Sequence, residues 1–471
     1  MFARYVIAAG LFVTSLPTLA AEPVTTPEDR TSLSLTVYQQ NLALVHDVRR
    51  IKFSAGRERL AIVGVPSALI PETVLAEGAT PNRLRVLGQV YEAALLTPEA
   101  LLEAAVGGMV HVVTVHPETG AETFTEAEVL RAQGREALVR LDDRIRTLDV
   151  RRLAFVSAPT ALRVRPTLVL DLASTTEGEE TLSLSYLTSG LNWRADYVAQ
   201  LSKDETEIRL AGWVTLTNTT ATAFKDARLR VVAGSINRTA RRPIAQPRLK
   251  ARMTALEASA DAPAESAVSD LRVFDFEEAI SIGRKEVRQL ALLPGTQVQV
   301  KKEYRLEGNA SHFGNIRRDV GHDYPAARFH LENTKAAGLG RSLPGGTLRL
   351  YAPATGGKVL RGEDTIRHTP KGETVTITAG RATDITSERR QTEFRREGLP
   401  RNVTESAHAI MLRNAKDEAV IVTVVEHIPG NWRMLSESQA HTKRKADEAV
   451  WRVSVPAGGE TELTYRVRTR F

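Results

Sequence analysis

The chain has 471 residues, 42% of them hydrophobic and 25% charged, with a formal net charge of +7 at pH 7 and no cysteine. This length exceeds what a single hydrophobic core organises, so we expect two or three domains. The lack of cysteine excludes disulfides, thiol nucleophiles and zinc–thiolate sites.

The first twenty residues have the order of an export signal. A short basic segment, residues 1–4, precedes the apolar run 5–13, and Thr18 and Ala20 place small residues where a signal peptidase cuts. The apolar run is too short for a transmembrane helix, and no other apolar stretch approaches the roughly 18 residues that a span needs. We therefore predict cleavage after about Ala20, a periplasmic or otherwise exported location, and no transmembrane span in the mature chain.

Strands are expected along most of the chain. Apolar and polar residues alternate with period two in short runs bounded by Gly, Pro, Asn or Asp, which indicates antiparallel sheet with one face in water. Helical patterns are rare, and the best candidates are 98–106 and 124–134. This pattern predicts an all-β protein. The clearest alternating runs are Leu33–Val37, Ile208–Leu216, Val298–Leu306, Val375–Ile377 and Leu463–Val467.

The spacing of the strand signals predicts tandem antiparallel β-sandwiches. Residues 21–83 and 158–308 are expected to form the N-terminal sandwich, and residues 325–471 a complete C-terminal one. Residues 84–157 are expected to form a small inserted β-barrel-like domain.

Two segments lack a strand pattern. Residues 240–270 are rich in Ala, Ser, Pro and charge, and we interpret them as a disordered excursion of the N-terminal sandwich. In residues 308–324, Gly, Asn, His and Arg occur together without periodicity, and we place the boundary between the two sandwiches there.

Four stretches carry a family resemblance: VYQQNLALVHDVRRIKFSAGRERLAIVGVPSALIPETVLAE (37–77), SYLTSGLNWRADYVAQL (185–201), GWVTLTNTTATAFKDARLRVVAG (212–234) and LENTKAAGLGRSLPGGTLRLYAP (331–353). In this order they resemble a bacterial family with a domain of unknown function, whose longer members are called mucoidy-inhibitor-like proteins. The coiled-coil segment of the longer members is missing, so the resemblance is to a short exported form. It implies β-rich architecture and an envelope setting, and it supplies no catalytic residues.

Five aromatic residues are expected in the cores. Trp193 and Tyr197 are four apart in a predicted strand and so share a face. We interpret them as anchors of core packing rather than a platform for a ligand. Trp213, Trp432 and Trp451 are expected to be buried as well.

No common motif of catalysis or cofactor binding is present. The ten histidines include no pair at metal-ligand helical spacing, and the HExxH and GxSxG motifs do not occur. Gly356-Gly357-Lys358 lacks both the leading spacing and the Ser or Thr of a phosphate-binding loop.

The remaining candidates are acids and histidines near predicted turns. The acid pairs 142–143 and 277–278 are adjacent in sequence, so in a strand their side chains point to opposite sides and make no hydrolase dyad. His322, Asp323 and His330 straddle the boundary near 308–324, where we expect a solvated turn rather than a metal site. We therefore predict no catalytic, metal-binding or cofactor-binding residue and no cofactor.

The basic charge is dispersed. Arginine pairs occur from Arg49-Arg50 to Arg395-Arg396, which is typical of a solvated surface rather than a nucleic-acid interface. An envelope protein or an acidic glycan is the expected partner, and nucleic acid is not.

Three functions remain open. The first is an exported, non-catalytic envelope protein whose sandwiches present loops to a protein or glycan. The second is a hydrolase of cell-wall or capsular polysaccharide, with carboxylates assembled from distant strands. The third is an outer-membrane-associated component, because residues 463–471 alternate toward a final Phe471 like the last strand of such proteins. The short strands and Pro-rich turns favour the first.

Overall fold

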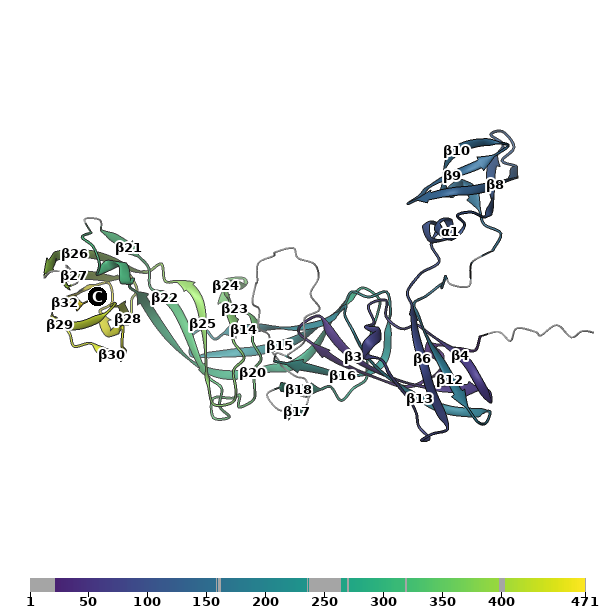
Figure 1. Ribbon diagram of the computed structural model, residues 1–471. Helices are drawn as coiled ribbons and strands as arrows, with labels where there is room; N and C mark the ends of the chain where they lie inside the picture. The colour runs from purple at the N-terminus through teal and green to yellow at the C-terminus, as the bar shows by residue number, and fades with distance from the viewer. Residues whose placement is uncertain are drawn as a thin grey trace, which may run out of the picture.

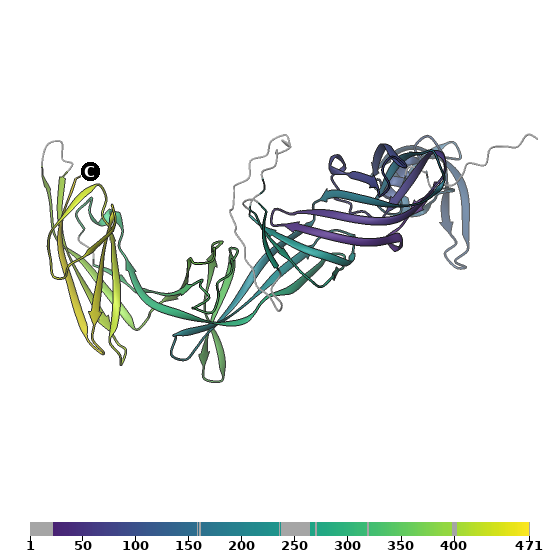
Figure 2. The same cartoon turned by 90° about the horizontal axis from the view of Figure 1, so that it is seen from below.

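The computed structural model describes residues 22–157, 159, 162–234, 236, 264–268, 271–317, 320–397 and 403–470. The predicted export signal therefore lies outside the described residues. The molecule is elongated, with the C-terminal strands at one end and the N-terminal sheets toward the other (Figure 1, Figure 2). Nearly every element is a strand, which confirms the all-β class.

Two sheets form the N-terminal sandwich. One has eight strands, in the order β17-β18-β16-β2-β3-β13-β5 with β19 beside β16, and the other has four, in the order β1-β4-β12-β6. Leu35, Leu170 and Leu184 are fully buried in the first hydrophobic core, to which both sheets contribute. The strands of the larger sheet are β2 (Arg30–Tyr38), β3 (Leu42–Phe53), β5 (Leu75–Gly78), β13 (Gly178–Thr188), β16 (Phe224–Ala233), β17 (Ala264–Val268), β18 (Leu271–Asp275) and β19 (Ile280–Ile282). Those of the smaller sheet are β1 (Val24–Thr25), β4 (Gly56–Val63), β6 (Leu84–Glu92) and β12 (Thr167–Ser174).

The insert stands apart from the sandwich in Figure 1 and has its own core, which includes Leu102, Val110 and Val129. It differs from expectation in two ways. Strand β6 pairs with β12 of the sandwich, so the insert begins after β6 and not at residue 84. Its sheet has the order β10-β9-β8-β7-β11, so the end strands do not pair with each other and the sheet stays open instead of closing like a barrel. Its elements are α1 (Pro98–Ala104), β7 (Met109–Val115), β8 (Glu122–Gln133), β9 (Glu136–Leu141), β10 (Arg144–Asp149) and β11 (Leu153–Ala154).

One of the two predicted helices is wrong. The helix expected at 98–106 is α1, where Thr97 accepts a hydrogen bond from the Ala100 N–H as N-cap and Pro98 occupies the first turn. The helix expected at 124–134 is instead part of β8, which pairs with β7 on one side and β9 on the other. Cross-strand pairing, which buries Ala127 and Val129, outweighs the local helical pattern.

A ten-stranded sheet crosses from the first core to the second. Its order is β24-β23-β14-β15-β20-β28-β31-β30, and β22 joins β20 to β25. Strand β20 links the cores, because Leu293 and Val298 lie in the first and Tyr304 and Leu306 in the second. The strands are β14 (Leu191–Leu201), β15 (Glu207–Asn218), β20 (Glu286–Glu307), β22 (Ala326–Glu332), β23 (Gly346–Ala354), β24 (Gly357–Ile366), β25 (Thr374–Arg381), β28 (Val420–His427), β30 (Thr442–Lys445) and β31 (Glu448–Val455).

The C-terminal sandwich packs a five-stranded sheet, ordered β21-β26-β27-β32-β29, over the end of the ten-stranded one. It is smaller than the expected 325–471 unit. Phe329, Leu350 and Ile377 lie in the first core, because β22, β23 and β25 attach to strands of that core. The strands are β21 (Gly321–Asp323), β26 (Ile385–Glu397), β27 (Val403–Asn414), β29 (Asn431–Glu437) and β32 (Glu460–Arg470).

The segment expected to be disordered is only partly described. Residues 240–263, 269 and 270 lie outside the described residues, and 264–268 form β17, which pairs with β18. No helix in the described part of the chain is both long and apolar enough to cross a membrane. Four short 3-10 helices complete the elements: η1 (Pro27–Asp29), η2 (Pro71–Thr73), η3 (Val150–Arg152) and η4 (Ala310–His312).

Four of the five aromatic residues expected in the cores are buried there: Trp193, Tyr197, Trp432 and Trp451. Trp213 is the exception, with 37% of its surface exposed. It lies between the buried residues Gly212 and Val214 of β15, and successive side chains of a strand point to opposite faces, so Trp213 points away from the core.

Candidate binding surface

Strands β23, β14, β15 and β20 are hydrogen-bonded in that order and form one broad sheet surface. One side of this surface packs into the first core through Trp193 and Tyr197. The alternate side chains, with Trp213 among them, point to the other side. We call this other side the Trp213 face. It comprises Arg194, Asp196, Val198 and Gln200 of β14, Glu207, Arg209, Ala211, Trp213 and Thr215 of β15, Gln289, Ala291, Pro294, Gln297 and Gln299 of β20, and Thr347, Arg349 and Tyr351 of β23.

Asp196 organises the polar groups beside Trp213. Its carboxylate accepts hydrogen bonds from the Thr215 hydroxyl at 2.7 Å, from Arg194 Nε at 3.1 Å and from an Arg349 guanidinium nitrogen at 3.3 Å. Gln289 donates in turn to the Thr215 hydroxyl at 3.2 Å. Burial alone would raise the pKa of Asp196, but these hydrogen bonds and the arginine charges outweigh it and lower the pKa. Asp196 is therefore a fixed anion that orients two arginines.

Small neighbours on two sides leave Trp213 partly exposed, with 37% of its surface accessible. The cross-strand partner of Trp213 on β20 is Ala291, and the next residue on the same side of β15 is Ala211. Alanine side chains are too short to cover an adjacent indole. The ring offers both an apolar surface and an N–H donor at the centre of the face.

A pocket of about 460 Å³ lies at one end of the Trp213 face. Gln200, Arg209 and Gln297 line it, and Gln297 donates to the Glu207 carboxylate at 3.2 Å. The guanidinium of Arg209 lies over Gly295, where a Cβ would come within 2.9 Å of Nε. The absence of a side chain at Gly295 thus lets Arg209 lie flat along the pocket.

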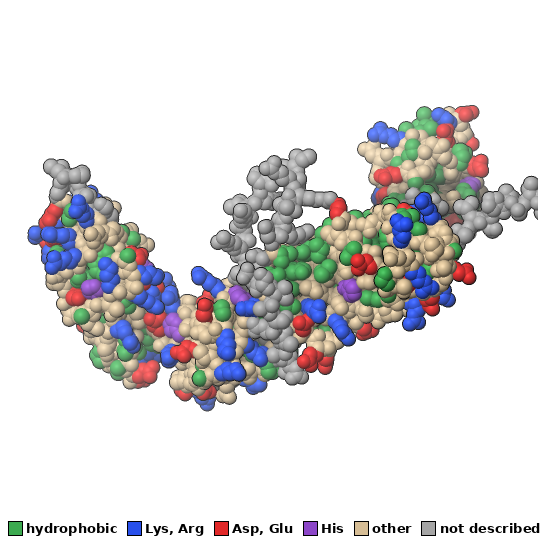
Figure 3. Space-filling view, turned by 60° about the horizontal axis from the view of Figure 1, so that its bottom comes forward, with side chains coloured by type: hydrophobic (Ala, Val, Ile, Leu, Met, Phe, Trp, Pro, Cys, Tyr) green, Lys and Arg blue, Asp and Glu red, His purple; other side chains and the backbone are tan. Residues whose placement is uncertain are grey.

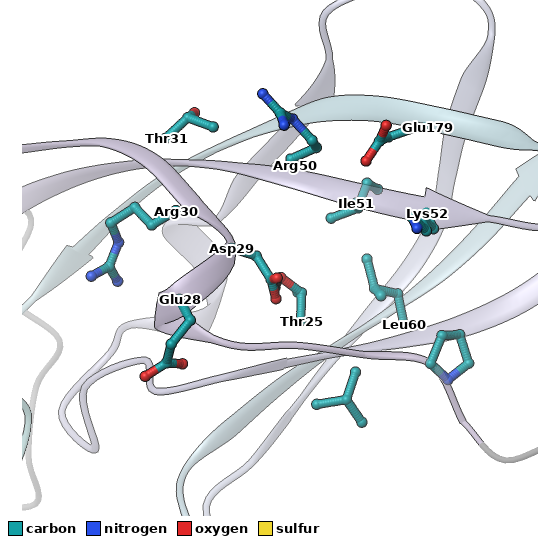
Figure 4. Close-up of a pocket in the computed structure, with 12 residues that line it drawn as sticks. Thr25, Glu28, Asp29, Arg30, Thr31, Arg50, Ile51, Lys52, Leu60 and Glu179 are labelled. Carbon is teal, nitrogen blue, oxygen red and sulfur yellow. Dashed lines mark hydrogen bonds between the residues drawn. The ribbon is translucent and has the colours of Figure 1, made fainter.

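A second pocket, of about 560 Å³, lies in the N-terminal sandwich beside η1 (Figure 4). Both charges occur on each side of the pocket: Arg30 lies near Glu28 and Asp29, and Glu179 lies near Arg50 and Lys52. Asp29 is turned toward Thr25, whose hydroxyl donates to it at 3.1 Å. The described residues that line this pocket include no aromatic ring, and the pocket does not adjoin the Trp213 face, which makes it the weaker candidate for binding.

Below this pocket a buried ion cluster has a structural role. Asp47 is fully buried and accepts from Arg30 at 2.8 Å and Arg49 at 2.9 Å. Arg49 also donates to the carbonyl oxygens of Thr25 and Val63 at 3.2 and 3.0 Å. Burial would raise the pKa of Asp47, but its two arginine partners lower it. The cluster holds the first described residues of the chain against the end of β4.

One histidine lies in a hydrogen-bonded row with an acid and a hydroxyl. His330 Nε2 lies 2.8 Å from Glu303 and its Nδ1 lies 3.0 Å from the Thr376 hydroxyl. The hydrogen bond from His330 is the main cause that lowers the pKa of Glu303 to about 2. The order acid–imidazole–hydroxyl matches that of a nucleophile relay. However, the three residues lie on the adjacent strands β20, β22 and β25 of one sheet. The same hydrogen bonds therefore also serve to link neighbouring strands.

The other residues weighed from the sequence are not brought together. Asp142 and Asp143 both have positive φ, 48° and 57°, in the two-residue turn between β9 and β10, so they are turn residues. Asp323 of β21 forms an ion pair with Arg381, and His322 beside it is exposed. No group of three or more His, Asp or Glu side chains in the described chain is arranged to hold a metal ion.

The sequence reasoning missed the Trp213 face. The signal was nevertheless present, because Ile208, Leu210, Gly212, Val214 and Leu216 form the alternating buried set, and Trp213 falls between its members. Burial was assigned to Trp213 because of its residue type, and its position in the alternation predicts the opposite.

Comparison with protein-family models gives a match. Residues 182–471 match the model of a domain of unknown function, DUF4139. This region includes all strands of the Trp213 face and the whole C-terminal sandwich. No curated protein matches the chain.

Proposed function

The chain belongs to the DUF4139 family, and from this premise we propose that it is an exported, non-catalytic protein of the cell envelope that works by binding. Within the family it would be a short exported relative of the mucoidy-inhibitor-like proteins. Its partner would be an envelope protein or a glycan, bound over the outer surfaces of the sandwiches.

The observation that carries this proposal is the Trp213 face. An exposed indole surrounded by ordered hydrogen-bonding groups is a binding feature, since exposed aromatic residues with a polar surround are enriched where proteins recognise ligands. Figure 3 shows basic and acidic side chains interspersed over much of the visible surface.

The carboxyl groups support a non-catalytic role. A glycosidase needs a general acid whose pKa is raised toward neutrality. Among the described residues, every Asp or Glu whose pKa departs from its ordinary value has it lowered, as for Asp149 and Glu303, each to about 2. Arg151 is the main cause for Asp149, and His330 for Glu303.

Export and interaction are tested in the native cell. We expect fractionation to place the full-length protein outside the cytoplasm, with an N-terminus at Ala21. A Leu11→Arg variant, which interrupts the apolar run, should stay in the cytoplasm uncleaved. In-cell crosslinking with mass spectrometry should then recover an envelope component. Uncleaved wild-type protein in the cytoplasm would contradict the proposal.

A hydrolase is the second candidate, favoured only by the row Glu303–His330–Thr376. The test is an assay of the pure protein against peptidoglycan, capsular polysaccharide and model esters, for which we expect no turnover. Turnover that disappears in Thr376→Val, or on replacement of an acid such as Asp323 or Glu278, while the circular dichroism spectrum is unchanged, would establish catalysis instead.

A further inference from the structure

We infer that the Trp213 face is a binding track for a neutral glycan chain, with the Trp213 indole stacking against one sugar ring. This inference rests on the proposed function and names the ligand class that the face would recognise. Three properties of the face support it: the aromatic ring at its centre, its planar hydrogen-bonding groups, and the pairing of two of its arginines with carboxylates.

The aromatic centre suits the face of a pyranose ring. The apolar C–H face of a sugar stacks on an indole, and Trp213 has Ala211 and Ala291 as its short neighbours on two sides. Tyr351 of β23 lies on the same face as the cross-strand neighbour of Gln200, two strands away from β15, which carries Trp213. The face thus has a second ring toward the β23 side.

Planar side chains are placed along the track on both sides of Trp213. Gln289 lies toward one end, and Gln297 and Gln299 toward the other, next to the pocket of about 460 Å³. Along β15, Arg209 and Trp213 are separated by about 13 Å at the usual rise of a strand. This length accommodates more than one sugar ring.

The amide groups are held in place and retain unused acceptors. The Nε2 atoms of Gln289, Gln297 and Gln299 donate to Thr215 and Glu207. Their carbonyl oxygens accept no hydrogen bond from any described residue, and all three side chains are exposed. Fixed acceptors and arginine donors on one face are suited to hydroxyl groups, each of which donates and accepts.

Two of the three arginines of the face are already paired with carboxylates of the protein. Arg349 lies between Asp196 and Glu363, at 3.3 and 2.8 Å, and Arg194 also pairs with Asp196. A polyanion would have to compete with these carboxylates for the same arginines and would meet their repulsion. A neutral chain meets neither obstacle, and therefore the expected ligand differs from the acidic glycan that the overall charge of the chain suggests.

The test is affinity electrophoresis of the pure mature protein in gels that contain one soluble polymer each. The neutral polymers are mixed-linkage β-glucan, galactomannan and dextran, and polygalacturonate is the acidic one. We expect at least one neutral polymer to retard the protein, and retardation to persist when sodium chloride is raised, because exposed charge contacts are screened by salt and hydroxyl contacts are not.

Variants locate the site. Trp213→Ala should weaken binding at least tenfold, Trp213→Phe should retain part of it, and Gln289→Ala should weaken it several-fold. Phe124→Ala removes a ring on the insert that is more exposed than Trp213, 57% against 37%, and it should leave binding unchanged. Circular dichroism and thermal unfolding of each variant establish that the fold is retained.

The proposal is overturned if no neutral polymer retards the protein, if Trp213→Ala binds like the wild type, or if only polygalacturonate binds and salt abolishes it. These results concern purified protein, so they are independent of the fractionation experiment. Failure of glycan binding with successful export and a crosslinked protein neighbour would remove this inference and leave the proposed function intact.

Discussion

The two cores of the molecule differ in how far their buried polar groups are hydrogen-bonded. In the first core, the Trp193 indole donates to the carbonyl oxygen of Val232 at 3.1 Å, and the buried Asp47 has two arginine partners. In the second core, both ring nitrogens of His408 and the hydroxyl of Ser406 are buried without a hydrogen-bond partner among the described residues. Burying an unpaired polar group costs free energy, so the second core depends more on the packing of its rings.

Those rings form a continuous ladder. His408 stacks on Tyr465 with centroids 5.2 Å apart, Tyr465 stacks on Trp451 at 4.9 Å, and His441 follows at 5.8 Å, with Trp432 next to it at 5.5 Å. Aromatic pairs of this kind add about 0.5–1.5 kcal/mol each beyond burial. The second core therefore combines extensive ring packing with a buried imidazole, His408, whose nitrogens have no hydrogen-bond partner among the described residues.

The largest effects are expected from removing one buried tryptophan from each core. Trp193→Ala and Trp451→Ala should each lower the free energy of unfolding by about 3–5 kcal/mol, because a large cavity is left behind. We expect each substitution to shift the transition of its own core in urea unfolding followed by circular dichroism. Val287→Ala, at a residue 61% exposed, is the matched control and should change little. Equal shifts of one shared transition would show that the cores unfold as a single unit.

The buried ion cluster of Asp47 with Arg30 and Arg49, in the N-terminal sandwich, is tested with Asp47→Asn. The substitution keeps the shape but leaves the buried Arg49 and the partly buried Arg30 without a counter-charge, so we expect a loss of about 3 kcal/mol. Asp171→Asn changes an acid that is 46% exposed in its side chain and, among the described residues, forms an ion pair only with Arg59, and it should cost less than about 1 kcal/mol. Comparable losses at the two positions would contradict the structural role assigned to Asp47.

The buried His408 of the second core is tested by measuring the free energy of unfolding as the pH is lowered. Burial, followed by the charge of Arg389, lowers the pKa of His408 to about 3, whereas the unfolded chain has the ordinary value near 6.5. The unfolded state therefore binds the proton more readily, and stability is lost as pH falls from about 6.5 toward 3. By pH 4.5 this loss should reach about 2–3 kcal/mol.

The matched variant is His408→Phe, which keeps a ring between Phe313 and Tyr465. It should be more stable than the wild type by about 1 kcal/mol at pH 7, because no polar nitrogen is left unpaired. Its advantage should grow as the pH falls from 6.5 to 4.5. An unfolding curve with the same pH dependence in variant and wild type would show that His408 does not cause the acid sensitivity.

Local sequence pattern was enough to predict the strand content, and all three buried tryptophans were expected in the cores. It did not predict which strands share a core. Phe329, Leu350 and Ile377 belong to the first core through pairing with β20 and β14, and such pairings between distant segments leave no local pattern. The helix expected at 124–134 failed for the same reason, since two partner strands determine its conformation.

The candidate site could be predicted only in part. The alternation places Trp213 outside the core, so its exposure was readable from residues 208–216. The contact between Asp196 and Arg349, which are 153 positions apart in sequence, could not be predicted, because it depends on the parallel pairing of β14 with β23. Surface sites assembled from several strands require the sheet order, which one sequence does not provide.

The smallest effect is expected at Trp213, the counterpart of Trp193 on the opposite side of the same sheet. Trp193 is 2% exposed and Trp213 is 37% exposed. Trp213→Ala should lower the free energy of unfolding by only about 1 kcal/mol, because solvent fills the space and no cavity forms. Parallel urea unfolding of Trp193→Ala and Trp213→Ala measures the difference. A loss at Trp213 as large as at Trp193 would mean that the indole supports the fold, and its exposure would then no longer indicate a binding role.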